Sequence, residues 1–116
     1  MLAKVVEGRK IGRTLGFPTA NLEFQNPAEM PENGVYGVDV TITGQTFRGV
    51  LNVGIRPTFG VSERVAEVHI LDFSQDIYNQ ILDISIQKFI RHEKPFDSPE
   101  GLKRQIEEDI AVAIKT

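Results

Sequence analysis

The feature that most constrains this fold is the alternation of apolar and polar residues in short segments. Every second residue of 35–43 is apolar, so four side chains share one face of an extended chain: Tyr36, Val38, Val40 and Ile42. Residues 46–53 repeat this alternation, and Gly44 and Gln45 between the two segments indicate a tight turn. The pattern therefore predicts a β-hairpin with one buried face.

Three further segments show the same β pattern. Residues 64–73 form a β-rich run, and residues 4–7 near the beginning are expected to be a short strand. Residues 81–91 alternate strongly, with one apolar face made by Leu82, Ile84, Ile86 and Ile90. The stretches 25–34 and 54–60 carry glycine and proline and are predicted to be loops.

The last segment has a different period, which predicts a helix. Ser98 is a favourable N-cap, and Pro99 suits the first helical position. Apolar residues then recur at helical spacing, with charged residues between them: Leu102, Ile106, Ile110, Ala113 and Ile114. Strands followed by one closing helix favour a small closed barrel, because closure removes exposed strand edges. The helix is expected to cover one side or one mouth of that barrel.

Composition narrows the class of protein. A chain of 116 residues, 41% hydrophobic and 25% charged, is expected to form one domain over 1–116. The absence of cysteine excludes disulfides, zinc–thiolate sites and a thiol nucleophile. The net charge of −3 argues against a protein that coats nucleic acid or membrane, and no apolar run approaches the ~20 residues of a membrane span. A reducing, cytoplasmic compartment is therefore expected.

The first candidate site is the glycine-rich, basic stretch 8–21. Its spacing matches neither a P-loop nor a dinucleotide-binding fingerprint. Glycines allow backbone N–H groups to approach phosphate oxygens, and Thr19 and Asn21 face the same side if the chain is extended there. A hydroxyl and an amide oxygen are hard ligands that suit Mg²⁺ shared with nucleotide phosphates. The alternative is a tight turn in which both side chains bond their own backbone.

The second candidate site is the segment Glu67-Val68-His69. Strand alternation places Glu67 and His69 on one face, beside the apolar Val65 and Leu71. A carboxylate that faces a barrel interior is costly unless it has a partner or a task, and a general base is one such task. Because no third ligand is visible, the pair is a poor metal signal. The alternative is a hydrogen-bonded or edge-exposed pair.

The third candidate site is the charged and aromatic stretch 89–98, which joins the last strand to the helix. Phe96 could stack on a flat ring, and Arg91 and Lys94 could hold polar or anionic groups. The alternative is a salt-bridged connector in which Phe96 packs as a hydrophobic staple for the helix.

Taken together, these segments resemble the riboflavin kinase family, whose flavokinase domains convert riboflavin to FMN. The resemblance runs through nearly the whole chain in order, and its most specific element is the Pro-Thr-Ala-Asn stretch at 18–21. The segments that carry it are 12–21, 34–37, 52–59, 67–73, 76–78, 89–91 and 96–98. The resemblance implies a mainly β fold: a six-stranded antiparallel closed barrel capped by a C-terminal α-helix.

The resemblance also implies roles for individual residues. ATP and Mg²⁺ would bind on one side of the barrel and riboflavin on the other, with Thr19 and Asn21 as metal and phosphate ligands. Glu67 corresponds to the family's catalytic base. Further nucleotide contacts would come from the glycine-rich loop and from the chain after that base, at Gly8, Lys10, Arg13, Ile70, Asp72 and Tyr78. The flavin would be held by the loop before the helix, at Arg91, Lys94 and Phe96.

The reaction that the resemblance implies is Mg²⁺-dependent phosphorylation of the riboflavin 5′-hydroxyl by ATP, which gives FMN and ADP. The alternative is a non-catalytic flavin- or nucleotide-binding module, used as a sensor or regulatory domain. Neither function involves nucleic acid or a membrane.

Two departures from the family stand out. Asn79 follows Tyr78 where the family commonly has glycine. The N-terminal FMN adenylyltransferase domain that many bacterial members carry is not in this sequence. We therefore expect either a free-standing kinase or a fragment of a bifunctional enzyme, with that domain as a fused or missing partner.

Overall fold

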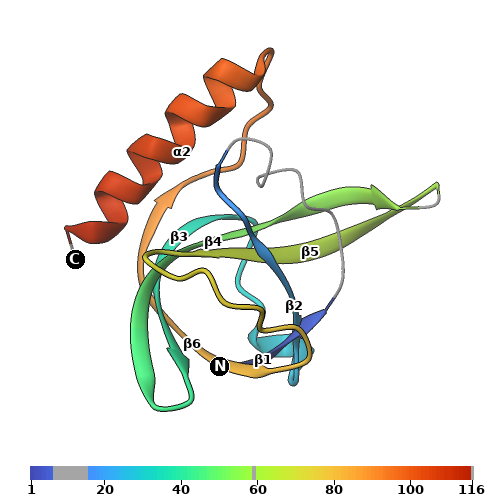
Figure 1. Ribbon diagram of the computed structural model, residues 1–116. Helices are drawn as coiled ribbons and strands as arrows, with labels where there is room; N and C mark the ends of the chain where they lie inside the picture. Colours follow the sequence, from blue (N-terminus) through green and yellow to red (C-terminus); the bar gives the residue numbers. More distant parts are fainter. Residues whose placement is uncertain (7–15, 59, 116) are drawn as a thin grey trace.

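The computed structural model describes residues 1–6, 16–58 and 60–115 (Figure 1). Within these residues, six strands form a closed antiparallel barrel in the order β1-β2-β5-β4-β3-β6. The strands are β1 Leu2–Val6, β2 Ala20–Phe24, β3 Gly34–Ile42, β4 Gln45–Thr58, β5 Val61–Ile70 and β6 Ile81–Arg91. The expected fold, a six-stranded barrel with a C-terminal helix, is confirmed.

The alternating pattern determines which side chains fill the barrel. The predicted apolar face of β3 is buried, and Val38 and Val40 are fully inaccessible to solvent. These side chains pack in one cluster with inward-facing residues of the other strands, among them Leu51, Val68, Leu82 and Ile84. The barrel interior is therefore a dry, closely packed core, and any binding site must lie at its surface.

The hairpin of β4 and β5 is longer than the sequence predicts. Residues 54–58 were expected in a loop, but β4 continues to Thr58, and its pairing with β5 extends to Thr58↔Val61. The antiparallel ladder satisfies backbone hydrogen bonds along this stretch, which outweighs the local preference of glycine and proline for loops. β5 ends at Ile70, before the predicted end at residue 73. Figure 1 shows the hairpin projecting from the barrel.

Strand β6 has the predicted bounds, but it does not keep one apolar face. Leu82 and Ile84 point into the barrel as expected. The pairing of β6 with β3 shifts register twice, and each irregularity turns the following side chains to the other face. The expectation that Ile90 shares the inward face is therefore wrong. Ile90 packs outside the barrel in a separate cluster with Val35, Val50 and Ala113.

Glu67 lies on the outer surface of the barrel. In β5 the buried residues are Ala66, Val68 and Ile70, so the alternate residues Glu67 and His69 point outward. The expectation of a carboxylate facing the interior is wrong, because the small and apolar residues at even positions form the inward face of this strand.

The chain ends in helix α2, Pro99–Ile114, which begins where the sequence predicts. The Ser98 hydroxyl accepts a hydrogen bond from the Gly101 N–H at 3.1 Å and so caps the first turn. The helix packs against β3, β4 and β6, and it covers one side of the barrel (Figure 1). A short 3₁₀ turn, η1 Pro27–Glu29, lies in the loop between β2 and β3. The space between α2 and the barrel wall forms much of the site described next.

Candidate active site

A row of polar side chains crosses three neighbouring strands on the outside of the barrel. Asn21 of β2 lies opposite Glu67 of β5, and Glu67 lies opposite Asn52 of β4. Directly paired residues in an antiparallel sheet share one face, so the three side chains project from the barrel together. The sheet register therefore brings Glu67 beside the Pro-Thr-Ala-Asn stretch, although the two are far apart in the sequence.

The first of two cavities at this row lies between the barrel and α2, and we call it the helix-side cavity. Its volume is about 560 Å³. Its polar and charged lining consists of Thr19, Asn52, Arg56, Glu67, His69, Arg91, Glu93, Lys94 and Asp109. Its apolar lining consists of Phe17, Val35, Val50, Pro95, Phe96, Leu102 and Ile106. The cavity thus combines an aromatic and aliphatic wall with convergent polar and charged groups, and small-molecule sites combine the same two kinds of surface.

The second cavity, of about 590 Å³, lies between β1, β2 and the segment that joins β5 to β6, and we call it the loop-side cavity. Its lining consists of Val5, Val6, Pro18, Thr19, Ala20, Asn21, Val68, Ile70, Phe73, Ser74, Gln75, Asp76, Ile77 and Tyr78. Thr19 lines both cavities. The Thr19 hydroxyl donates a hydrogen bond to Glu67 Oε2 at 3.3 Å, so the junction of the two cavities lies beside the carboxylate.

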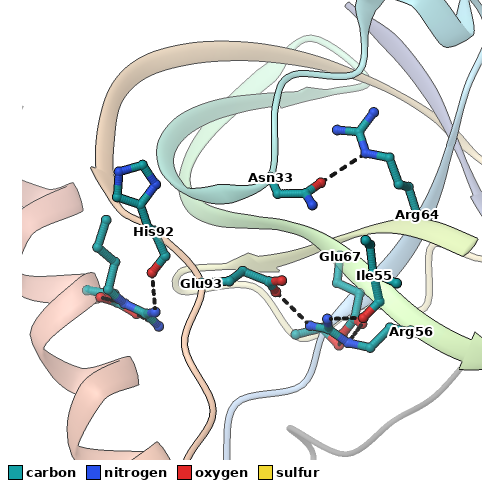
Figure 2. A network of polar contacts seen from close by, with 10 residues as sticks. Asn33, Ile55, Arg56, Arg64, Glu67, His92 and Glu93 are labelled. Carbon is teal, nitrogen blue, oxygen red and sulfur yellow. Dashed lines mark hydrogen bonds and ion pairs between the residues drawn. The ribbon is translucent and has the colours of Figure 1, made fainter. Parts of the chain in front are cut away.

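Arg56 lies between two carboxylates in the helix-side cavity (Figure 2). Its Nη2 donates to Glu93 Oε1 at 3.1 Å, and its Nη1 donates to the Ile55 carbonyl oxygen at 3.0 Å. Its Nε is 4.0 Å from Glu67 Oε1. Glu67 Oε2 thus accepts a hydrogen bond from Thr19, while Glu67 Oε1 faces the Arg56 guanidinium at a longer distance.

Arg91 is engaged with the helix. Its Nε and Nη2 each donate to the Asp109 carboxylate at 2.9 Å, and its Nη1 donates to the His92 carbonyl oxygen. Asp109 is only 2% exposed, so this pair is largely shielded from water. The Arg91 guanidinium and the Lys94 ammonium both lie over the Phe96 ring, at 5.7 and 5.6 Å from its centre. The salt-bridged connector therefore exists, and it also forms a wall of the helix-side cavity.

His69 holds the chain that leads into Thr19. Its Nδ1 lies 2.8 Å from the Pro18 carbonyl oxygen, and its ring meets Phe17 edge-on at 5.7 Å between centres. Among the described residues, no group of three or more His, Asp or Glu side chains could hold a metal ion. His69 therefore serves as a support for the Pro-Thr-Ala-Asn stretch.

The structure divides the predicted site residues between the two cavities. Thr19, Asn21, Ile70 and Tyr78 line the loop-side cavity. Thr19 also lines the helix-side cavity, together with Glu67, Arg91, Lys94 and Phe96. Asp72 instead lines a third cavity with Phe47 and Arg48, and the described lining of that cavity includes neither Ile70 nor Tyr78. Gly8, Lys10 and Arg13 lie outside the described residues.

Thr19 and Asn21 offer the donor chemistry that Mg²⁺ needs. Both carry hard oxygen atoms and lie on the same outward-facing part of the chain, next to the Glu67 carboxylate. Mg²⁺ in proteins usually keeps several waters and takes only one or two protein ligands beside substrate phosphates. The residues present therefore fit a magnesium ion that is bound together with a nucleotide.

Sequence reasoning did not single out Asn52, Arg56, Glu93 or Asp109. Asn52 Oδ1 is buried and has no hydrogen-bond partner among the described residues, and it belongs to the lining of the helix-side cavity. The sequence contained one usable signal, because Asn52 and Arg56 lie in a segment, 52–59, that carries the family resemblance. Nothing in the periodicity indicated that Asp109 is buried or that Glu93 meets Arg56.

Comparisons with known proteins agree with this geometry. A family model described as riboflavin kinase matches residues 1–116. The chain is 43% identical to a bifunctional riboflavin kinase/FMN adenylyltransferase of Haemophilus influenzae, over 97% of this chain and 37% of that protein. It is 44% identical to the RNA-binding riboflavin kinase RibR of Bacillus subtilis, over 96% of this chain and 48% of that protein. The chain thus spans less than half the length of these curated relatives.

Two solved structures share the fold. A crystal structure titled macrolide-efflux protein, from Streptococcus pneumoniae, is 40% identical with a TM-score of 0.91, and covers 99% of this chain and 38% of that one. A riboflavin kinase from Trypanosoma brucei is 22% identical with a TM-score of 0.68, over 98% of this chain and 76% of that one. In the described part of this chain, no helix has the length and apolar character needed to cross a membrane.

Proposed function

Because the chain belongs to the riboflavin kinase family, we propose that it transfers the γ-phosphoryl group of ATP to the 5′-hydroxyl of riboflavin, giving FMN and ADP. We treat residues 1–116 as one riboflavin kinase domain. The observation that carries the proposal is the position of Thr19, which lines both cavities and donates a hydrogen bond to Glu67. A transfer between two substrates needs two neighbouring sites with a carboxylate close to both, and the shared lining residue Thr19 beside Glu67 supports this assignment.

Riboflavin would bind in the helix-side cavity. Phe96 offers a flat apolar surface for the flavin ring, and Lys94 beside it offers a donor to the ring's polar edge. Arg91 contributes through its pair with Asp109, which fixes α2 and the 92–98 loop against the barrel. The ribityl chain would extend from the ring toward Glu67 at the junction of the cavities.

ATP would bind in the loop-side cavity, where Ile70 and Tyr78 provide apolar and aromatic surface for the base. The phosphates would extend toward Thr19, and the family resemblance adds Gly8, Lys10 and Arg13, which lie outside the described residues, as candidate phosphate contacts. Asp72 lines a different cavity, so we leave it out of the proposed nucleotide site. A reaction that uses ATP fits the cytoplasmic location expected from the sequence.

Glu67 would act as the general base. Its Oε2 is held by Thr19, while its Oε1 accepts no hydrogen bond within the described part of the chain and lies at the cavity surface. That oxygen can accept the proton of the 5′-hydroxyl as the hydroxyl attacks the γ-phosphorus, and the ADP leaving group departs in line. Thr19 and Asn21 would hold Mg²⁺, which when bound neutralises phosphate charge.

The alternative, a non-catalytic flavin- or nucleotide-binding module, would need neither the second cavity nor an oriented carboxylate. One relative is named RNA-binding, but the net charge of −3 gives this chain no general attraction to a polyanion. We therefore keep riboflavin and ATP as the proposed partners.

The test is to incubate the protein with riboflavin, ATP and Mg²⁺ and to separate the flavins by chromatography. We expect FMN from the unaltered protein, and a rate lower by ~10²–10⁴-fold from Glu67→Gln, the usual loss for a general base. Riboflavin binding, followed by flavin fluorescence, should be nearly unchanged. Glu107→Gln removes one charge from an exposed position of α2 and is the matched control. Riboflavin that is bound but never phosphorylated would contradict the proposal and support the sensor alternative.

A further inference from the structure

Arg56 is held close to Glu67 without closing onto it. Arginine and carboxylate groups that are free to pair usually form two parallel hydrogen bonds of about 2.7–2.9 Å. Here the shortest ion-pair contact, from Arg56 Nε to Glu67 Oε1, is 4.0 Å. Both side chains are largely shielded, at 29% and 19% exposure, so the attraction between them is only partly screened by water. Something must therefore hold the guanidinium back.

The restraint comes from Glu93 on the 92–98 loop. Glu93 Oε1 accepts a hydrogen bond from Arg56 Nη2 at 3.1 Å, and the Ile55 carbonyl oxygen accepts one from Nη1 at 3.0 Å. In Figure 2, Arg56 lies between Glu93 and Glu67, with dashed contacts to both. Two of its three nitrogens are therefore engaged away from the base.

The fold provides a specific place for the Glu93 carboxylate. It lies directly against Gly54 of β4, where an added Cβ atom would overlap the Glu93 carboxylate. Any other residue at position 54 would push this carboxylate aside. Gly54 thus allows the contact between Glu93 and Arg56, which lies two residues further along β4.

Other charges in the helix-side cavity do not duplicate this contact. Arg91 is paired with Asp109, Lys94 lies over the Phe96 ring, and His69 contacts Pro18. Among the described residues, Glu93 is the carboxylate that hydrogen-bonds Arg56. Within the described residues, Glu67 is the other carboxylate that lies within 4.0 Å of the Arg56 side-chain nitrogens, so it is available to Arg56 when Glu93 is lost.

We propose that Glu93 is a positioning residue that tethers Arg56 and so keeps Glu67 Oε1 open for the substrate hydroxyl. The inference rests on the proposed kinase function. Without the tether, Arg56 closes onto Glu67 and occupies the oxygen that must accept the proton. The 92–98 loop then has two tasks: it forms the wall of the flavin site, and it holds the cation beside the base at a fixed distance.

The first part of the test uses two variants that release Arg56 in different ways. Glu93→Ala removes the carboxylate, whereas Gly54→Ala keeps all charges and displaces the carboxylate with a methyl group. Both should lower kcat by about tenfold, less than the ~10²–10⁴-fold loss for removal of the base itself. The Kd for riboflavin, followed by flavin fluorescence, should change much less. Glu93→Gln retains an acceptor oxygen and should lose less activity than Glu93→Ala.

The second part adds Arg56→Gln to each variant. If Arg56 blocks the base, its removal restores kcat, so Glu93→Ala/Arg56→Gln should turn over several times faster than Glu93→Ala alone. A merely structural role for Glu93 predicts no recovery, because a second substitution would add a second defect. Glu107→Ala on the exposed face of α2 is the control for loss of a carboxylate.

The outcomes separate this inference from the proposed function. Absence of FMN from the unaltered protein would contradict the kinase proposal itself. An active unaltered protein with no recovery in the double variants, or with full activity in both Glu93→Ala and Gly54→Ala, would overturn the tether while leaving the kinase intact.

Discussion

The two cavities that meet at Thr19 differ most in their charge. The helix-side cavity is lined by two arginine–carboxylate pairs, Arg56 with Glu93 and Arg91 with Asp109, in addition to Glu67. In the loop-side cavity, the described lining contains one charged residue, Asp76, whose carboxylate accepts a hydrogen bond from the Tyr78 N–H. The more highly charged cavity is therefore the one proposed for riboflavin, which is the uncharged substrate.

The difference indicates that charged groups serve different purposes in the two cavities. On the helix side the charges are paired with each other, so they fix the position of a loop, a helix and a base rather than attract an ion. On the loop side, which we propose for ATP, the described lining offers no cation, so under the proposal the counter-charge would come from Mg²⁺ or from residues outside the described ranges. The predictions below test this division of tasks.

The largest expected effect is on stability. Arg91→Met leaves Asp109 buried and unpaired, and such a loss costs about 3–5 kcal/mol of unfolding free energy. Chemical denaturation should show this loss as a lower midpoint. The double variant Arg91→Met/Asp109→Leu should recover much of it, because it removes the unpaired charge. A single variant as stable as the unaltered protein would contradict a structural task for this pair.

The next effect is on binding without Mg²⁺. Chelation of the metal should weaken ATP binding by about tenfold or more, equivalent to about 1.4 kcal/mol, because the described loop-side lining offers no cation to the phosphates. Riboflavin affinity should remain within about twofold. Calorimetry for ATP and flavin fluorescence for riboflavin would measure both. If chelation weakened ATP and riboflavin binding equally, the proposed difference in charge between the two binding sites would be wrong.

A smaller effect is expected at Asn52. Its buried Oδ1 has no partner in the described residues, and the residue belongs to the lining of the helix-side cavity, so we expect a bound ligand to donate a hydrogen bond to it. Asn52→Ala should weaken riboflavin binding by about 2–10-fold, the value of one neutral hydrogen bond. The affinity for ATP should not change. The free energy of unfolding should also stay the same in this respect, because Asn52 Oδ1 makes no hydrogen bond within the described residues that the substitution could remove. Unchanged riboflavin affinity would remove Asn52 from the site.

The smallest effect is expected at Tyr36, which belongs to the barrel core and lines neither cavity. Its hydroxyl donates to the Glu32 carbonyl oxygen at 2.6 Å, so Tyr36→Phe should cost about 1 kcal/mol of stability. Both Kd values should stay the same, which makes this variant a control for the others. A change in either affinity would mean that the core and the cavities are coupled.

Tyr36 also gives a pH dependence whose sign is defined. Burial, followed by the nearby Glu32 carboxylate, raises the pKa of the Tyr36 phenol above its usual 10.0. The neutral phenol is thus favoured in the folded state. Its contribution to stability is present below pH 10.0 and is lost as the pH rises through the raised pKa. Absorbance of the phenolate during an alkaline titration would test this, with Tyr36→Phe as the reference.

Local patterns predicted those parts of the fold that depend on neighbours in sequence. The helix begins at Pro99 as predicted, and strand β6 has the predicted bounds, because a cap and a strict period are local signals. The extension of β4 to Thr58 was missed, since pairing with β5 outweighs the local loop preference. Likewise, the outward direction of Glu67 depends on which face of β5 meets the core, and alternation alone leaves that open.

The candidate site was predicted in part, and mainly through the family resemblance. The proximity of Thr19 to Glu67 is found in the structure, with a hydrogen bond between them. Arg56, Glu93 and Asn52 were not predicted as a group, because they meet through sheet register and through a loop that folds back onto β4. These contacts join polar and charged residues of types that are common on any protein surface. The pattern of a single sequence therefore carries little information about them.

The two register shifts between β3 and β6 have one more consequence. They place the neighbouring residues Ile90 and Arg91 toward α2, where the first packs with Ala113 and the second pairs with Asp109. A regular strand would direct consecutive side chains to opposite faces. The attachment of the helix, which forms one wall of the helix-side cavity, therefore depends on the irregularity of this strand.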